Sequence, residues 1–280
     1  MAHARRGGAE AMLPVPGRSL SRARAEGPGM VLARMRDMVP SIHLIGAHRV
    51  LPRQADMLRA AGALPVTIDT RDEVTEIAQQ THALAVHTGA IDDKALDAML
   101  WAAETARELN HPWVLDPAEV GMTGYRRQPA GALLTRRPSA IVAGPADIYA
   151  AAHIGAETQH EDVRAAAMDL ARRTGAVVAV TGAEDFVTDG DVALTVAGGH
   201  MLLTRVDGAG AALAALVAAF LAAERDALAG TVAALAFYAA AAREAASAAQ
   251  GPGSFIAALQ DALFLIGPEA VDAGPRIGPA

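Results

Sequence analysis

LLTRVDGAGA, residues 202–211, leads directly into the apolar run 212–223. The pattern predicts a short strand at 202–206, then a tight turn, and then a buried helix. A turn of this kind directs several backbone N–H groups, together with the positive end of the helix, at one point in space. Such a point attracts a phosphate or a developing oxyanion. The segment therefore predicts an α/β fold with an anion site at Gly208 and Gly210.

The rest of the chain alternates short apolar runs with amphipathic segments. Strands are predicted at 41–45, 64–68, 83–87, 113–115, 140–142, 176–180, 186–188 and 192–196. Helices are predicted at 31–38, 54–61, 73–81, 94–109, from about 146, and at 161–174, 210–228, 231–249 and 254–265. The last two strands flank Asp189-Gly190, which is typical of a hairpin. This alternation predicts a three-layer α/β/α fold with a mostly parallel central sheet.

The composition excludes several classes of protein and site. Hydrophobic residues make up 52% of the 280 residues and aromatic residues only 4%, which suits helices packed tightly on a sheet. A net charge of −7 argues against nucleic acid as a partner. The absence of cysteine excludes disulfides, thiolate metal sites and thiol nucleophiles, and it fits a cytoplasmic location. The longest uncharged run, 208–223, is shorter than the roughly 20 residues that span a bilayer, so no membrane association is expected.

Residues 1–29 differ in character from the rest. They contain several arginines, glycines and prolines without strand or helix periodicity, and they lack the apolar segment of a secretory signal. Two interpretations stay open: a disordered basic extension, or a start codon assigned too early with Met30 as the true start. Residues 30–280 are predicted to form a single domain.

Ligands of such sheets bind at the carboxyl ends of the strands. Asp116 ends a buried strand, where a carboxylate can hold Mg²⁺ beside a nucleotide phosphate or can simply cap the next turn. Thr181 and Gly182 end another strand, where a hydroxyl can reach a phosphate. Neither a P-loop nor a G-x-S-x-G motif is present, which disfavours P-loop nucleoside triphosphatases and serine hydrolases.

Three histidines, His43, His48 and His87, also fall near strand ends. This placement would allow them to cluster in the cleft. Their spacing resembles no zinc signature, so a structural role is expected for each.

Six segments, taken in order over about residues 30–265, resemble the hydroxyethylthiazole kinases of thiamine salvage, within the ribokinase-like superfamily. They are residues 31–45 (opening helix and first strand), 62–66 (G-A-x-P-V), Asp116-Pro117 with Gly121, Thr123, Tyr125 and Arg126 (D-P-V-G-x-G-x-T-x-[FY]-R), Thr181-Gly182 (I-T-G), 208–210 (T-G-x-G-C) and 251–255 (G-P-G-S-F). The resemblance implies phosphorylation of the primary alcohol of 4-methyl-5-(2-hydroxyethyl)thiazole with ATP and Mg²⁺. It also implies a homotrimer with sites at the subunit interfaces.

The resemblance assigns roles to particular positions. The implied roles are catalysis for Gly208, Gly210 and Ala211, contact with the acceptor alcohol for Thr67 and Gly208, nucleotide binding for Ala143, Thr181 and Gly182, and metal binding for Asp116 and Asp147.

Several of these positions depart from the family pattern. The cysteine of T-G-x-G-C, where the wider superfamily has its catalytic aspartate, is Ala211, and the preceding threonine is Asp207. The arginine of R-G-N-x-x-E is Ala143, and Asp147 lies one place before its glutamate. Residues 45–52 correspond to the family's I-T-N-x-V-x-x-N and contain neither asparagine. Thr67 stands where the family has a substrate-contacting methionine, and His87 stands where it has an asparagine.

These departures leave alternatives open. Asp207, or His48, can replace the missing proton acceptor. A changed pocket suits a different small alcohol as acceptor. The loss of polar residues also suits an impaired kinase fold that serves as a ligand-binding or regulatory protein.

Overall fold

The computed structural model describes residues 27–280, and its centre is a nine-stranded sheet in the order β2-β1-β3-β4-β5-β6-β7-β8-β9. The strands are β1 (Ser41–Ile45), β2 (Leu64–Val66), β3 (Ala83–His87), β4 (Trp113–Asp116), β5 (Ala140–Ala143), β6 (Val177–Val180), β7 (Glu184–Thr188), β8 (Ala193–Ala197) and β9 (Arg276–Pro279). The six strands from β2 to β6 are parallel to their neighbours, whereas β7, β8 and β9 add antiparallel. The predicted mostly parallel sheet is confirmed.

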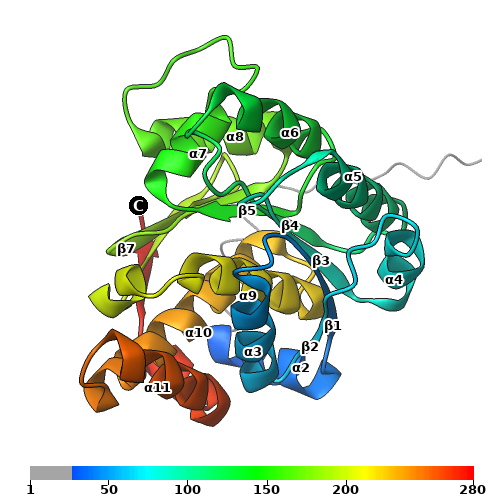
Figure 1. Ribbon diagram of the computed structural model, residues 1–280. Coiled ribbons are helices and arrows are strands. Elements are labelled where there is room, and N and C mark those ends of the chain that lie inside the picture. The colour runs from blue at the N-terminus through cyan, green and yellow to red at the C-terminus, as the bar shows by residue number, and fades with distance from the viewer. Residues whose placement is uncertain (1–26) are drawn as a thin grey trace, which may run out of the picture.

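Helices cover both faces of this sheet (Figure 1). On one face lie α5 (Asp93–Glu108), α6 (Gly124–Leu134), α7 (Pro145–Ala152) and α8 (Val163–Thr174), with the short α4 (Val74–Gln80) beside α5. On the other face lie α2 (Pro28–Met38), α3 (Leu51–Ala61), α9 (Ala209–Ala223), α10 (Ala227–Ala248), α11 (Pro252–Leu265) and α12 (Pro268–Ala273). The three-layer α/β/α prediction is therefore confirmed. Among residues 27–280, no helix combines the length and the apolar character that crossing a membrane requires.

The strand side chains divide between two hydrophobic cores because successive residues of a strand point to opposite faces. Leu44 and Val114 pack toward α9 and its neighbours, while Ile45 and Leu115 pack toward α5 to α8. All four are essentially buried. Burial on both faces explains why these strands read as continuous apolar runs in the sequence.

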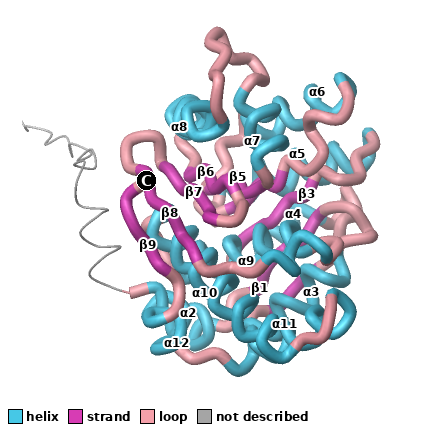
Figure 2. Tube along the Cα trace, turned by 90° about the vertical axis from the view of Figure 1, so that its left-hand side faces the viewer, coloured by secondary structure: helices cyan, strands magenta, loops and turns pink. Residues whose placement is uncertain are grey.

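The first described helix, α2, packs against α12 near the C-terminus. Figure 2 shows α2 beside α12, and the N–H of Gly29 donates to the Asp272 carboxylate at 2.8 Å. Helix α2 thus begins at Pro28, slightly before Met30. The two interpretations of the segment before it fall mainly on residues 1–26, which lie outside the described residues.

The predicted strand at 202–206 is wrong. Residues Met201–Arg205 form a 3₁₀ helix, η1. Local bonds explain the difference: the His200 carbonyl accepts the Leu203 N–H at 3.1 Å, and the His200 ring accepts the Leu202 N–H at 3.3 Å. The sheet edge beyond β8 is moreover occupied by β9, whose residues come from the far end of the chain.

Other differences from the sequence prediction have local causes. Helix α6 was not predicted because its sequence contains Pro129 and two glycines, and its stability comes from the buried side chains of Leu133 and Leu134. The predicted helix 210–228 ends at Ala223, because the Asp226 side chain accepts the Leu228 N–H at 3.1 Å and begins α10. The short elements α12 and β9 were also not predicted.

Candidate active site

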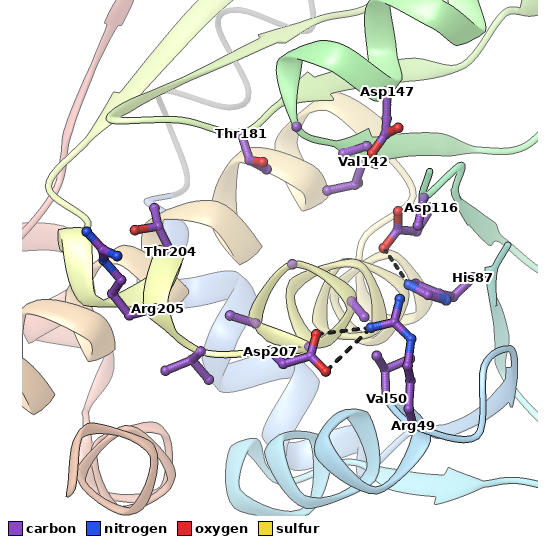
Figure 3. A pocket seen from close by; sticks show the side chains of 18 residues that line it. Arg49, Val50, His87, Asp116, Val142, Asp147, Thr181, Thr204, Arg205 and Asp207 are labelled. Atoms are coloured by element: carbon purple, nitrogen blue, oxygen red, sulfur yellow. Dashed lines mark hydrogen bonds and ion pairs between the residues drawn. The ribbon is translucent and has the colours of Figure 1, made fainter. Parts of the chain in front are cut away.

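A cavity of about 490 Å³ opens at the carboxyl ends of the parallel strands, where the loops after β1, β3, β4, β5 and β6 converge (Figure 3). It is lined by Arg49, Val50, His87, Asp116, Ala118, Val142, Ala143, Gly144, Asp147, Thr181 and residues 204–211. The predicted residues Asp116, Ala143, Asp147, Thr181, Asp207, Gly208, Gly210 and Ala211 therefore all lie around one space. The packing of parallel strands brings them together, since the ends of neighbouring strands share one edge.

The glycine turn forms one wall of this cavity. Gly208 has φ +77° and caps the N-terminus of α9, and a Cβ built on it would approach the Arg53 Cβ to 3.3 Å. Glycine is therefore needed there for conformation as well as for space. A Cβ on Gly210 would meet no atom within 4 Å, because this residue faces the open cavity.

The first turn of α9 offers backbone donors to that space. The Ala212 N–H donates to the Gly208 carbonyl at 2.9 Å. The N–H groups of Gly210 and Ala211 come earlier in the helix and have no carbonyl of the helix to bond to. Both residues line the cavity. Their N–H groups lie at the positive end of a 15-residue helix, an arrangement suited to the anion site expected from the sequence, which stays a prediction.

The side chain at position 211 contributes only a methyl group. Ala211 is buried and packs against Ala47 and Val50, and its carbonyl accepts a 3.0 Å hydrogen bond from the Gln54 amide. The proton acceptor that the superfamily pattern places here is absent, as the sequence indicated. Asp207, directly before the turn, lines the cavity with a carboxylate that is largely exposed.

Asp116 supplies a buried carboxyl on the opposite wall. Burial and, to a smaller extent, the nearby charge of Asp147 raise its pKa to about 8, although the Ala118 N–H partly opposes the shift. His87 lies beside it, with Nε2 3.8 Å from Asp116 Oδ2. Burial and the charge of Arg49 lower the pKa of His87 to about 4. At pH 7 both groups are therefore mainly neutral.

The geometry around His87 also indicates its tautomer. Nδ1 accepts the Gly89 N–H at 3.1 Å, so the ring proton resides on Nε2 and faces Asp116. The other two histidines lie elsewhere: buried His43 contacts the Ile68 carbonyl through Nε2 at 2.7 Å, and His48 is exposed. The possible histidine cluster is not formed.

Asp147 is the second carboxylate of the site. It lies in the first turn of α7, where burial raises its pKa and hydrogen bonds from the backbone N–H groups of Glu119, Val120 and Gly121 oppose that shift. Asp147 thus lies close to the loop after β4.

The pair Asp116 and Asp147 fits Mg²⁺ chemically. This ion commonly takes one or two carboxylates and completes its shell with phosphate oxygens and water. Two mutually repelling carboxyls, one of them buried, are also stabilised as anions by a bound cation. Within residues 27–280 no group of three or more His, Asp or Glu side chains is arranged to hold a metal. The phosphates of a nucleotide would therefore have to supply the remaining ligands.

A second cavity of about 630 Å³ adjoins the first. The two share Gly144, Thr181, Thr204, Ala209 and Gly210 as lining residues. The second cavity adds Gly182 and a mainly apolar lining that includes Val196, Leu203 and Leu213. Thr181 thus lies where the two cavities meet, which suits its predicted contact with a nucleotide phosphate.

Thr67 is the one predicted site residue that lies apart. It follows β2 at the outer edge of the sheet, where it is exposed, and it lines neither cavity. Within one chain the structure does not bring Thr67 to Gly208.

Sequence analysis did not identify the ion pairs formed by Arg49, which lines the cavity, and by its neighbours. Arg49 Nη2 lies 2.7 Å from Glu119, and Arg49 Nη1 lies 3.2 Å from Asp207. Arg126 lies 3.1 Å from the other Glu119 oxygen and donates to the Thr88 carbonyl at 3.1 Å. The position of Arg49 just after the first strand was the available signal, since ligand-binding residues follow strand ends.

Comparisons with known proteins agree with this geometry. The model of the hydroxyethylthiazole kinase family matches residues 32–269. The chain belongs to the hydroxyethylthiazole kinase family. It is 40% identical over 261 residues to the hydroxyethylthiazole kinase of Cereibacter sphaeroides (90% of this chain, 98% of the relative). It is 39% identical over 257 residues to that of Rhizobium etli (88% and 99%).

Solved structures of hydroxyethylthiazole kinases and their fold relatives agree as well. The kinase from Pyrococcus horikoshii OT3 superposes with a TM-score of 0.85 at 33% identity, over 90% of this chain and 98% of that one. The pyridoxal kinase from Staphylococcus aureus, in complex with AMP-PCP, superposes with a TM-score of 0.56 at 15% identity over 74% and 89%. The second likeness shows the fold alone, and the predicted ribokinase-like architecture is confirmed.

Proposed function

We propose that this member of the hydroxyethylthiazole kinase family transfers the γ-phosphoryl group of ATP to the primary alcohol of 4-methyl-5-(2-hydroxyethyl)thiazole. The observation that carries the proposal is the arrangement of one cavity. The N-terminus of α9 with Gly208 and Gly210 faces the buried carboxyl of Asp116 and the carboxylate of Asp147 across it. Backbone N–H groups that can bind a phosphate, placed opposite acidic residues that can bind a cation, suit a nucleotide phosphate with its cation.

The backbone of the turn binds the phosphoryl oxygens. The N–H groups of Gly210 and Ala211 stabilise the charge that develops on these oxygens, which is the main contribution of a protein to phosphoryl transfer. Thr181 offers its hydroxyl to the same phosphates. The nucleoside occupies the adjoining, mainly apolar cavity.

Asp116 and Asp147 would hold Mg²⁺, which when bound neutralises phosphate charge and orients the phosphates. The acceptor hydroxyl lies over Gly208, and its proton passes to the carboxylate of Asp207 and then to water. Asp207 thereby replaces the side chain missing at Ala211. Because the transition state of phosphoryl transfer is loose, a base contributes less than charge neutralisation, and the methyl of Ala211 is compatible with turnover.

Two alternatives to hydroxyethylthiazole phosphorylation predict different experimental results. A kinase of another small alcohol is favoured by Arg49 and His87, which add polar groups to the cavity. A ligand-binding or regulatory protein would retain the fold without turnover. The cytoplasmic location and the homotrimer implied by the family resemblance remain predictions.

The deciding experiment is ATP- and Mg²⁺-dependent phosphorylation of hydroxyethylthiazole by the purified protein, with Asp116→Ala as the control. We expect turnover in the wild type and a loss of at least about 100-fold in the variant, because one buried metal-binding carboxylate is removed. Retained ATP binding without turnover would indicate another acceptor. The absence of both turnover and ATP binding would contradict the kinase assignment.

A further inference from the structure

Arg49 is placed to bind more than its two carboxylate partners. It lies between β1 and α3, and its guanidinium bridges Glu119 from the loop after β4 and Asp207 from the loop before α9. Figure 3 shows this guanidinium between Asp207 and the pair formed by Asp116 and His87. Its charge also reaches the buried wall, where it contributes to lowering the pKa of His87.

The ion pairs of Arg49 are of a kind that a stronger anion can displace. The Arg49 side chain is 49% exposed, and those of Asp207 and Glu119 are 73% and 40% exposed. Ion pairs between exposed side chains contribute little to stability. A guanidinium and a phosphoryl group, by contrast, form bidentate charge-assisted hydrogen bonds. A phosphoryl group entering the cavity can therefore replace Asp207 as the partner.

The acidic lining of the cavity favours a positively charged side chain near a bound triphosphate. Asp116, Asp147 and Asp207 all line the cavity, and a triphosphate would add further negative charge. The other arginine in the lining, Arg205, lies beside Thr204 at the end formed by η1 (Figure 3). Arg49 is the guanidinium at the end where Asp116 and the glycine turn face each other.

We propose that Arg49 binds the transferred phosphoryl group of ATP, exchanging Asp207 for phosphoryl oxygens while Glu119 holds the guanidinium over the cavity. This inference rests on the proposed function. In the step it serves, the alcohol oxygen bonds to the γ-phosphorus while the bond to the β–γ bridging oxygen breaks. That electron pair leaves with ADP, and the alcohol proton passes to Asp207, which the exchange has released from Arg49.

Binding of two nucleotides tests the inference without turnover. Isothermal titration calorimetry in Mg²⁺ compares AMP-PCP, which carries a γ-phosphoryl group, with ADP, which lacks it. We expect Arg49→Gln to weaken AMP-PCP binding about 10- to 100-fold, the range for a lost hydrogen bond to a charged group, and to change ADP binding less than about threefold. Arg49→Lys keeps the charge without the fork and should lie in between. The matched control is Arg59→Gln, an exposed arginine of α3 at the other end of that helix.

A double-mutant cycle separates phosphoryl binding by Arg49 from a structural role in which its ion pair with Asp207 connects two loops. If Arg49 binds the phosphoryl group, Arg49→Gln weakens AMP-PCP binding at least as strongly in an Asp207→Asn background as in the wild type, because Asp207 no longer competes for the guanidinium. If Arg49 acts through Asp207, the effect shrinks in that background and the inference is overturned. Equal weakening of AMP-PCP and ADP, or no weakening of either, overturns it as well.

The behaviour of the wild type separates the role of Arg49 from the proposed kinase function. A wild type that binds AMP-PCP and phosphorylates the alcohol, beside an unaffected Arg49→Gln variant, would overturn the role of Arg49 alone. A wild type that binds neither nucleotide would overturn the proposed function together with the role of Arg49.

Discussion

At the scale of single residues, the buried carboxyl of Asp116 is the most informative group of the chain. It lies on an otherwise apolar strand and is 5% exposed. Neither burial nor the neighbouring Asp147 favours its ionised form. A group held in an unfavourable state by the fold is typical of a functional site, because the ligand restores the balance.

The raised pKa of Asp116 predicts a pH dependence of stability. Between its usual pKa near 4 and its folded pKa of about 8, the folded chain keeps a proton that the unfolded chain releases. The free energy of unfolding therefore falls as pH rises through this window. His87, with its lowered pKa, makes the free energy of unfolding rise with pH, but only below about pH 6.5. Asp185, whose pKa burial raises to about 6, makes it fall with pH, also mainly below about pH 6.5. The contribution of Asp116 is best separated between about pH 6.5 and 8.

We expect Asp116→Asn to reduce the fall in unfolding free energy between about pH 6.5 and 8 by about 1–2 kcal/mol. Urea denaturation at the two pH values, without nucleotide and with a chelator, measures it. Asp97→Asn on the exposed surface of α5 is the control and should leave the slope unchanged. Equal slopes in the wild type and Asp116→Asn would show that Asp116 ionises normally.

At the scale of elements, the turn before α9 separates folding from binding. Its two glycines, Gly208 and Gly210, differ in backbone conformation and in surroundings. Gly208 needs the left-handed backbone and has Arg53 beside it, whereas Gly210 lies within the helix and faces the cavity.

We expect Gly208→Ala to lower the free energy of unfolding by about 1–2 kcal/mol, because a Cβ is disfavoured at φ +77°. Gly210→Ala should keep or slightly raise stability, since alanine favours a helix over glycine by up to about 1 kcal/mol. Its methyl should nevertheless weaken ATP binding, because it projects where the phosphate would lie. Thermal unfolding and nucleotide titration of the two variants form a matched pair. An unstable Gly210→Ala variant with normal ATP binding would contradict this division of roles.

At the scale of the whole molecule, Thr67 connects the site to assembly. It is exposed after the edge strand β2, next to the exposed side chains of Leu64 and Ile68. If Thr67 contacts the acceptor alcohol, as the family resemblance implies, it must do so in a cavity of another copy of the chain, because it lines neither cavity of its own. An edge strand with exposed apolar side chains is also a common place for association.

We therefore expect the full-length chain to elute as a homotrimer in size-exclusion chromatography with light scattering. Leu64→Arg should shift it toward monomer and raise the KM for the alcohol more than the KM for ATP. Leu109→Arg, an exposed leucine that follows α5, is the control. A monomeric and fully active wild type would remove Thr67 from the site.

Prediction from sequence succeeded where a local pattern and its physical cause coincide. The hairpin at Asp189-Gly190 and the mostly parallel sheet were both predicted from the local order of turn residues and apolar runs. It failed for η1, where apolar residues that suit a strand bond locally because β9 already occupies the sheet edge. It also missed α6, whose proline and glycines are outweighed by tertiary burial.

The sequence by itself determined the fold class and the loss of a proton acceptor at Ala211, because periodicity and residue identity are local properties. It also determined that Asp116 ends a buried strand. Only the tertiary structure decided that Arg49, Glu119 and Asp207 meet over the cavity and that Thr67 lies outside it. Residues 49 and 207 are far apart in the chain, and their contact depends on how α3 and α9 pack beside each other on one face of the sheet. Residue identity fixes which charges are available, but only the packing of helices on strands brings them within reach of a common ligand.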